Sequence, residues 1–169
     1  MADLLFGKVS PSGKLPLTFY HNEALDEMPD FTDYSMANRT YRYYTGTPLY
    51  PFGYGLTYGK VSLSDLKLGK AAAGQPLEVT VTAKNDGTVD TDEVVQVYIK
   101  DLKSPLAVVN HSLCGFKRIS LKAGESKEVT IALDDKAFRY FDIGTNQFEV
   151  ESGTYEISVA ASVSDVKLS

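Results

Sequence analysis

The C-terminal part of the chain, residues 60–169, alternates apolar and polar positions with a period of two between turn signals. In residues 77–84 the odd positions are apolar and the even positions are polar, and the same alternation recurs in 95–100, 129–133 and 155–160. Period-two alternation is typical of strands with one face on a core and the other in solvent. We therefore predict half-buried strands in all four segments.

Three further segments, 61–68, 113–121 and 147–150, bring the expected total to about seven short strands, which indicates an immunoglobulin-like sandwich of the all-β class. The cysteine pair of antibody domains is missing and the chain has no tryptophan, so a fibronectin-III-like variant fits better.

Connections are predicted from local turn chemistry. Asn85-Asp86-Gly87 reads as a hairpin turn, and turns are also expected at Lys122-Ala123-Gly124-Glu125 and Glu151-Ser152-Gly153. The stretch Asp134–Phe138 lacks alternation, and we expect it to form one helical turn that crosses between the sheets.

The first twenty residues have a different character. Ala2–Phe6 resembles the last turn of a helix that stops at Gly7, and Lys14–Phe19 is strand-like, with Pro16 restricting it to an edge. A helix end and one strand cannot bury themselves. Residues 1–20 are therefore interpreted as the edge of another domain, expected to be disordered, folded back onto the sandwich, or paired with a second copy.

Residues 21–59, called the strap below, show little periodicity and no clear helix or sandwich strand, but they hold seven of the eleven tyrosines. Loops of this length in compact domains are usually functional or linkers. The strap is too aromatic for a disordered linker, so we expect it to lie across a surface and bury its rings there.

Composition narrows the function classes. The 169 residues carry a net charge of -5 with mixed signs, and no Lys/Arg cluster indicates nucleic-acid binding or a basic membrane patch. No apolar stretch approaches the roughly 20 residues that span a bilayer, and residues 1–6 do not form a signal peptide. The lone Cys114 is expected to be a buried small hydrophobe. We expect no cofactor and no metal, because Asp90, Asp92 and Glu93 lack the spacing of a calcium loop and two histidines are too few for zinc.

Several motifs resemble one enzyme family. Pro11-Ser12-Gly13-Lys14-Leu15-Pro16-Leu17-Thr18-Phe19 is similar to the strand that closes the α/β-sandwich domain of family 3 glycoside hydrolases, the β-glucosidase type. Arg39-Thr40-Tyr41-Arg42-Tyr43 and Pro48-Leu49-Tyr50-Pro51-Phe52-Gly53-Tyr54-Gly55-Leu56-Thr57-Tyr58 resemble the connection into the family's third domain. Glu93–Tyr98, Leu113–Arg118, Ala123–Ser126 and Val150–Tyr155 are similar to its C-terminal fibronectin-III-like domain.

This resemblance implies a parent with a TIM barrel, an α/β-sandwich domain and the fibronectin-III-like domain. It also implies a retaining mechanism with two carboxylates, both placed upstream of the point matched by Met1. No catalytic residue is expected in this chain. Its own loop carboxylates are expected to be solvated: Glu23, Asp26, Glu27, Asp30, Asp33, Asp134 and Asp135.

The candidate site residues follow from the strap and the segment before it. We expect an interface to the missing domains at Leu15, Leu17, Phe19, Arg39, Arg42, Tyr50 and Phe52. The two arginines would pair there with acids of the parent, or within the chain with Asp30 or Asp33. Tyrosine rings suit the apolar faces of sugars, and the candidate sugar contacts are Tyr41, Tyr43, Tyr44 and Tyr54. Packing against the sandwich is the favoured alternative for these rings.

The leading hypothesis is a non-catalytic domain of a β-glucosidase-type hydrolase that braces the catalytic domains and helps to shape the substrate cleft. A carbohydrate-binding module that uses the strap for a β-glucan or oligosaccharide is one alternative. A protein-interaction module is another, since this fold serves many functions. Self-association through the orphan N-terminal strand is also expected to be open to the isolated chain.

Overall fold

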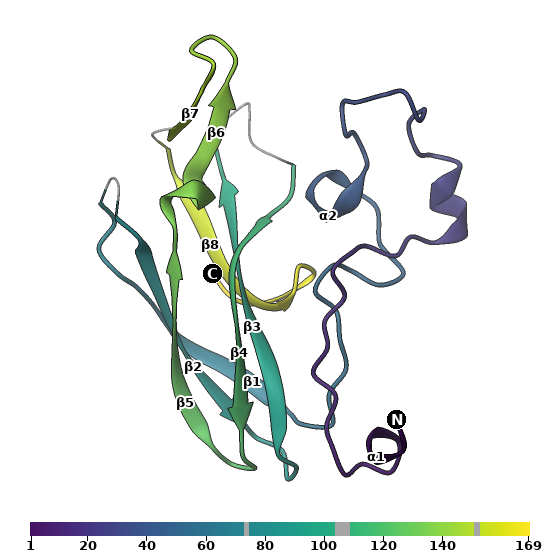
Figure 1. Cartoon of the computed structure of the whole chain (residues 1–169), viewed down its shortest axis with the longest axis vertical. Coiled ribbons are helices and arrows are strands. Elements are labelled where there is room, and N and C mark those ends of the chain that lie inside the picture. Colours follow the sequence, from purple (N-terminus) through teal and green to yellow (C-terminus); the bar gives the residue numbers. More distant parts are fainter. Residues whose placement is uncertain (73–74, 104–108, 151–152) are drawn as a thin grey trace.

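The alternating segments form two antiparallel sheets in the computed structural model, which describes residues 1–72, 75–103, 109–150 and 153–169. One sheet has the order β1-β2-β5 and the other β4-β3-β8-β9, and they face each other as a sandwich (Figure 1). A separate pair, β6-β7, projects from one end of the sandwich. The all-β, fibronectin-III-like fold is confirmed.

The strands are β1 (Val61–Leu68), β2 (Leu77–Asn85), β3 (Thr91–Asp101), β4 (Ser112–Leu121), β5 (Ser126–Leu133), β6 (Arg139–Asp142), β7 (Gln147–Val150), β8 (Tyr155–Ser162) and β9 (Asp165–Leu168). All seven expected strands are present, and β6 and β9 were not predicted. The helical turns are α1 (Ala2–Leu5), η1 (Asn22–Leu25), α2 (Thr40–Tyr43) and η2 (Asp135–Phe138). None of the described helices is long and apolar enough to cross a bilayer.

The core lies between the two sheets and is built from the apolar positions of the alternating segments. In β2 the odd positions are buried and the even positions Glu78 and Lys84 are exposed, as predicted. The cluster is mostly β-branched and aliphatic, which suits side chains packed on a pleated surface. Its members are Leu77, Val79, Val81, Ala83, Val95, Val97, Leu121, Val129, Ile131, Leu133 and Val159.

The turn at Asn85-Asp86-Gly87 corrects one prediction. It is not a hairpin, because β2 and β3 lie in different sheets. Asn85 is fully buried, and its side-chain amide donates to the carbonyls of Val89 at 2.8 Å and Leu121 at 3.4 Å. The Asn85 carboxamide thus supplies hydrogen bonds to backbone carbonyls where the chain crosses between the sheets.

The other predicted turns have different outcomes. The expected helical turn is confirmed as η2, which Asp134 caps. The turn predicted at Glu151–Ser152 lies outside the described residues.

The middle of the four-stranded sheet corrects a second prediction. Gln96 and Tyr98 in β3 fall on the polar face of the pattern, yet they are only 3% and 1% exposed. Ser158 and Ala160 of β8 are buried on the same face, since Tyr98 pairs with Ser158 and Gln96 with Ala160. The half-buried assignment was therefore wrong for these two strands, because another part of the chain covers their outer face.

The covering part is the N-terminal third of the chain, which runs alongside the sandwich (Figure 1). Residues 14–19 form no regular strand, but the amide of Leu15 donates to the Tyr54 carbonyl at 2.8 Å, and an isolated bridge joins Phe19 to Tyr50. The segment is thus folded back, one of the three outcomes expected for it. The strap also contains two short helical turns, η1 and α2, where no helix was predicted.

Removal of core volume tests this assignment. Leu133→Ala should lower the free energy of unfolding by about 2–5 kcal/mol, because Leu133 is fully buried between the sheets. Leu68→Ala, at a position that is 53% exposed, is the matched control and should change it by less than about 0.5 kcal/mol. Urea unfolding followed by circular dichroism measures both. Equal effects for the two variants would contradict the core described above.

Candidate functional site

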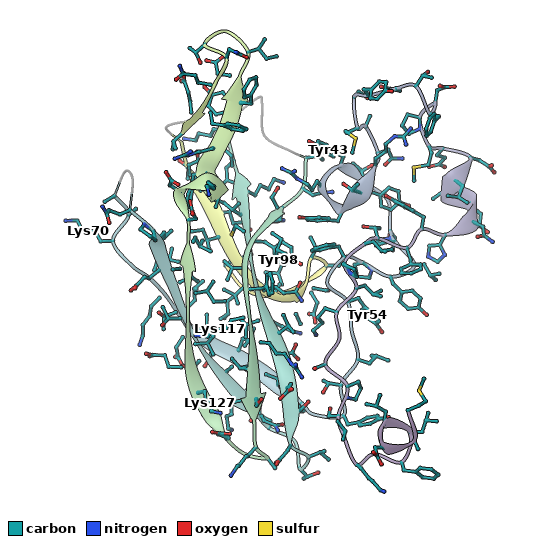
Figure 2. All side chains as sticks on the ribbon, viewed as in Figure 1. Tyr43, Tyr54, Lys70, Tyr98, Lys117 and Lys127 are labelled. Carbon is teal, nitrogen blue, oxygen red and sulfur yellow. The ribbon has the colours of Figure 1, made fainter. Side chains whose placement is uncertain are left out.

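An aromatic stack joins the strap to the outer face of the four-stranded sheet. The ring of Tyr41, in α2, stacks on Phe52 with centroids 4.1 Å apart and planes 14° apart. Tyr98 of β3 meets Tyr41 edge to face at 6.4 Å, and it lies where the strap approaches the sheet (Figure 2). The backbone amide of Leu113 donates to the Tyr41 hydroxyl at 3.1 Å. Both the ring and the hydroxyl of Tyr41 are therefore engaged within the chain.

Asn110 holds the end of α2 from the sandwich side. Its side-chain amide donates to the carbonyls of Tyr41 at 2.9 Å and Tyr44 at 2.7 Å, and its backbone amide donates to the Arg42 carbonyl at 2.9 Å. Carbonyls at a helix end lack partners within the helix, and one asparagine supplies three donors to them. Sequence reasoning missed Asn110, because no local pattern links it to a helix 66 residues or more away.

A second contact joins Gly53 to β3. The Gln96 side-chain amide donates to the Gly53 carbonyl at 3.1 Å and to the Ala161 carbonyl at 2.8 Å, and the Tyr98 hydroxyl donates to Gln96 Oε1 at 2.6 Å. Gly53 has φ +80°, and a Cβ there would collide with Gln96 Oε1 and lie 2.8 Å from the Tyr98 hydroxyl. Burial raises the pKa of Tyr98 far above its ordinary value, so this hydroxyl stays a donor.

A buried ion pair fixes the segment before the strap. Lys14 Nζ lies 2.8 Å from Glu93 Oε1, and the two side chains are only 13% and 10% exposed. The same carboxylate oxygen accepts the Val94 amide at 2.8 Å. Nearby, the hydroxyls of Ser10, Thr57 and Thr91 lie 2.5–2.8 Å from one another, and these residues come from three separate parts of the chain.

The predicted interface residues divide into two groups. Leu15, Arg39 and Phe52 are half-buried, whereas Leu17, Phe19, Arg42 and Tyr50 are exposed. Eleven further large apolar side chains of residues 1–59 are exposed: Met1, Leu5, Phe6, Val9, Leu25, Phe31, Tyr34, Met36, Leu49, Leu56 and Tyr58. The N-terminal third thus covers the outer face of the sheet through some of its residues and leaves many of its apolar side chains exposed.

The two arginines do not form the expected ion pairs with Asp30 or Asp33. Arg39 Nη2 donates to the backbone carbonyls of Pro29 and Asp30, each at 2.9 Å, while its Nε is buried and has no partner in the described structure. Arg42 Nε donates to the Ser112 hydroxyl at 3.2 Å. A guanidinium donates through five N–H groups in a fixed fork. In Arg39 the acceptors of the Nη2 group are two backbone carbonyls, where a carboxylate was expected.

The four candidate sugar contacts are all half-buried. Tyr44 packs edge to face on Tyr20 at 4.9 Å, and Tyr54 packs against Tyr50 at 5.3 Å. Tyr41 and Tyr44 line a hollow of about 290 Å³ together with His111, and Tyr43 lines a second of about 560 Å³. Ring packing accounts for three of the four tyrosines, and the sugar contact stays a prediction.

The groups that would carry chemistry are poorly suited to it. Hydrogen bonds from the side chain and amide of Thr32 lower the pKa of Asp30, and the Ser35 amide lowers that of Asp33. A glycosidase acid instead needs a raised pKa. Burial raises the pKa of Cys114 to about 12, so its thiol is protonated at neutral pH.

Among the described residues, no three His, Cys, Asp or Glu side chains lie close enough together to hold a metal ion. The three acids considered above as a calcium loop, Asp90, Asp92 and Glu93, each have a different partner. Asp90 accepts the Ala123 amide at 2.9 Å, Asp92 pairs with Arg118, and Glu93 pairs with Lys14.

Comparison with known proteins decides the family. Residues 1–58 match the glycosyl hydrolase family 3 C-terminal domain, and residues 93–163 match the fibronectin type III-like domain. The chain therefore belongs to family 3 of the glycosyl hydrolases, and it matches the C-terminal part of that family. It is similar to a xylan 1,4-β-xylosidase of Xylanibacter ruminicola, at 38% identity over 99% of this chain and 19% of the relative.

Two other relatives extend this result. An exo-α-(1->6)-L-arabinopyranosidase of Bifidobacterium longum is 40% identical over 98% of this chain and 23% of its own length. The crystal structure of a family 3 β-glucosidase from Bifidobacterium adolescentis superposes with a TM-score of 0.86 at 36% identity, over 98% of this chain and 26% of the enzyme. The chain thus spans about a fifth to a quarter of the length of these relatives, whose names specify three different glycosidase activities.

A Cβ at Gly53 tests the contact between strap and sheet. Gly53→Ala should destabilise the protein by about 2–4 kcal/mol, because it adds a clash with Gln96 to the strain of positive φ. Gly124→Ala is the matched control, with φ +75° and nothing within 4 Å of the added atom, and should cost about 1 kcal/mol. Thermal unfolding compares the two. Equal losses would mean that the strap does not press on β3.

Removal of one partner tests the buried ion pair. Lys14→Met should cost about 3–5 kcal/mol, because it leaves the Glu93 carboxylate buried without its counter-ion. Lys8→Met breaks the exposed pair with Asp3 and should cost less than about 1 kcal/mol. Recovery of stability in the double variant Lys14→Met/Glu93→Gln would assign the loss to the uncompensated charge. If the double variant is no better than the single one, this explanation fails.

Proposed function

We propose that this chain is the non-catalytic C-terminal bracing domain of a family 3 glycoside hydrolase of the β-glucosidase type. One observation carries the proposal, namely the two-sided N-terminal third. Its inner side is fixed to the sandwich by Tyr41, Gly53 and Lys14. Its outer side presents apolar side chains such as Leu17, Phe31 and Tyr34 to solvent.

Contiguous apolar surface of this kind marks an interaction site, and we infer that these exposed side chains form such a surface. The natural occupant is the catalytic body that accounts for most of the length of the relatives. Leu17, Phe19 and Tyr50 would contact it, because their side chains are exposed. The strap would then transmit the position of the sandwich to the catalytic domains and help to shape the edge of the substrate cleft.

The domain boundaries belong to the same proposal. Residues 1–20 would complete the edge of the α/β-sandwich domain, residues 21–59 would connect the two domains, and residues 60–169 would form the brace. The free edge of residues 14–19, away from their contacts with Tyr50 and Tyr54, would pair with that sheet.

The chain alone should be inactive. We expect no hydrolysis of p-nitrophenyl β-glucoside or β-xyloside above the buffer rate. The loop carboxylates named above are exposed, apart from Asp135, which pairs with Arg139, so none of them has the environment of a glycosidase acid. Turnover that disappears on substitution of one carboxylate would overturn the proposal.

The melting temperature tests the alternative function, a carbohydrate-binding module. It is measured with glucose or a gluco-oligosaccharide present and compared with the value in sucrose, which serves as a non-specific osmolyte. No shift beyond that of sucrose supports a brace. A specific shift abolished by Tyr43→Ala would instead favour sugar binding at the hollow that Tyr43 lines.

A further inference from the structure

The first part of the strap, residues 21–39, is called the outer loop below. It forms a closed excursion on the side of the molecule away from the sheets (Figure 1). Its two ends meet, since the Thr40 amide donates to the Tyr20 hydroxyl at 2.7 Å and the Tyr20 ring packs on Tyr44. The hydrogen bonds that hold the loop join residues within 20–45. Compact surface loops with closed ends are frequently functional.

The outer loop holds most of the net charge of the chain. It has five acidic residues and one basic residue, Arg39, so its net charge is -4, compared with -5 for the whole chain. An excess of negative charge on one element attracts a positive surface and repels another acidic one. All five acids are exposed: Glu23, Asp26, Glu27, Asp30 and Asp33.

Two aromatic residues lie among these acids in the sequence. Phe31 is 90% exposed and Tyr34 is 89% exposed, more than any other Phe or Tyr in the described part of the chain. Aromatic side chains that become buried at the centre of an interface supply much of its binding energy. Phe31 and Tyr34 are therefore the anchors that the outer loop offers to a partner.

Hydrogen bonds within the loop hold these anchors in place. Asp30 accepts the Thr32 amide at 2.9 Å and the Thr32 hydroxyl at 2.6 Å, and Asp33 accepts the Ser35 amide at 2.8 Å. Arg39 ties the loop together through its bonds to two of the loop's backbone carbonyls. Each anchor thus sits beside a turn that an aspartate closes.

The backbone that follows the anchors is strained. Met36, Asn38 and Thr40 have φ of +62°, +55° and +57°, a region that asparagine tolerates but that is costly for methionine and for the β-branched threonine. Such conformations persist only where the surrounding structure determines them. The outer loop is thus a preformed surface, which loses little conformational entropy when it binds.

We propose that the outer loop docks on the catalytic body of the parent, where Phe31 and Tyr34 enter an apolar hollow whose rim carries Lys and Arg side chains. The inference rests on the proposed bracing function and adds the chemistry of the partner surface to it. The match to the glycosyl hydrolase family 3 C-terminal domain includes the outer loop together with residues 1–20, which precede it. The sandwich leaves the two anchors uncovered.

The charge selects among the candidate occupants. A second copy of this chain would bring two loops of net charge -4 together, and like charges in an interface oppose binding. An anionic membrane or a nucleic acid would repel the loop for the same reason. A basic rim instead pairs with the acids around the anchors and fixes the orientation in which the loop docks.

Hydroxyl-radical footprinting, read residue by residue by mass spectrometry, measures whether the loop is covered. The probe is a chimaera in which this chain replaces the matching C-terminal segment of the xylosidase relative, and the reference is the chain alone. Phe31 and Tyr34 should be oxidised about tenfold or more slowly in the chimaera, because rings buried in an interface are shielded from the radical. Leu68, 53% exposed on β1 in the sheet that does not face the strap, should react equally in both within about twofold.

Xylosidase activity shows that the catalytic body of the chimaera is folded. If the chimaera is inactive, a graft of residues 21–39 alone into the matching stretch of the intact xylosidase takes its place, and the same protection of Phe31 and Tyr34 is expected.

Charge reversal tests the nature of the partner surface. Glu23→Lys/Glu27→Lys makes two changes of +2, which bring the net charge of the loop from -4 to 0. It should reduce the protection about threefold or more, because a basic rim repels the new lysines. Glu78→Lys/Glu128→Lys makes the same change at exposed positions of the three-stranded sheet and should leave the protection unchanged. Unchanged melting temperatures of the isolated variant chains would show that they fold.

The outcomes separate this inference from the proposed function. If Leu17 and Phe19 are protected in the chimaera but Phe31 and Tyr34 are not, the brace stands and the outer-loop contact is wrong. If none of the four is protected, both proposals fail. Protection that Glu23→Lys/Glu27→Lys leaves unchanged would overturn the basic partner surface. Protection of Phe31 in the chain alone at high concentration would assign the loop to a second copy and overturn the inference as well.

Discussion

The structure depends on burial of the second face of β3. Gln96 and Tyr98 lie on the side of the sheet that an isolated sandwich would show to water, and the strap removes them from it. A buried glutamine and tyrosine need partners, which they find in each other and in the Gly53 carbonyl. The four-stranded sheet therefore has a core on both faces, one built by the sandwich and one built by the strap.

This arrangement explains why the strap is ordered without long helices or strands of its own. Asn110 binds the carbonyls at the end of α2, Phe52 accepts a hydrogen bond from the Val163 amide, and Lys14 reaches Glu93. Each contact joins residues far apart in sequence. The same contacts fix the orientation of the outer apolar side chains, so the surface offered to the catalytic domains of the proposed parent is held by the sandwich and not by the strap alone.

Much of the fold could be predicted from the sequence, because the pattern of one buried face is local. The alternation in residues 77–84 placed β2 and its buried face correctly. The same rule failed for Gln96 and Tyr98, since Gly53, which covers them, is 43 residues from Gln96 in sequence. It also missed the four-residue strands β6 and β9. Asn85-Asp86-Gly87 has hairpin chemistry, but its role at a crossing between sheets depends on which strands pair. The aromatic strap was predicted to pack on a surface, whereas Asn110, its main polar anchor, carries no local signal.

We infer that the strap and the sandwich unfold as one cooperative unit, and native-state hydrogen exchange can test this inference. The Asn110 and Val163 amides donate to the carbonyls of Arg42 and Phe52, so they report on the junction, whereas the Val97 amide reports on the core sheet. If strap and sandwich unfold together, all three amides exchange with the same free energy, that of global unfolding. If the Asn110 and Val163 amides exchange with a much smaller free energy than the Val97 amide, the strap detaches on its own and the two parts are not one cooperative unit.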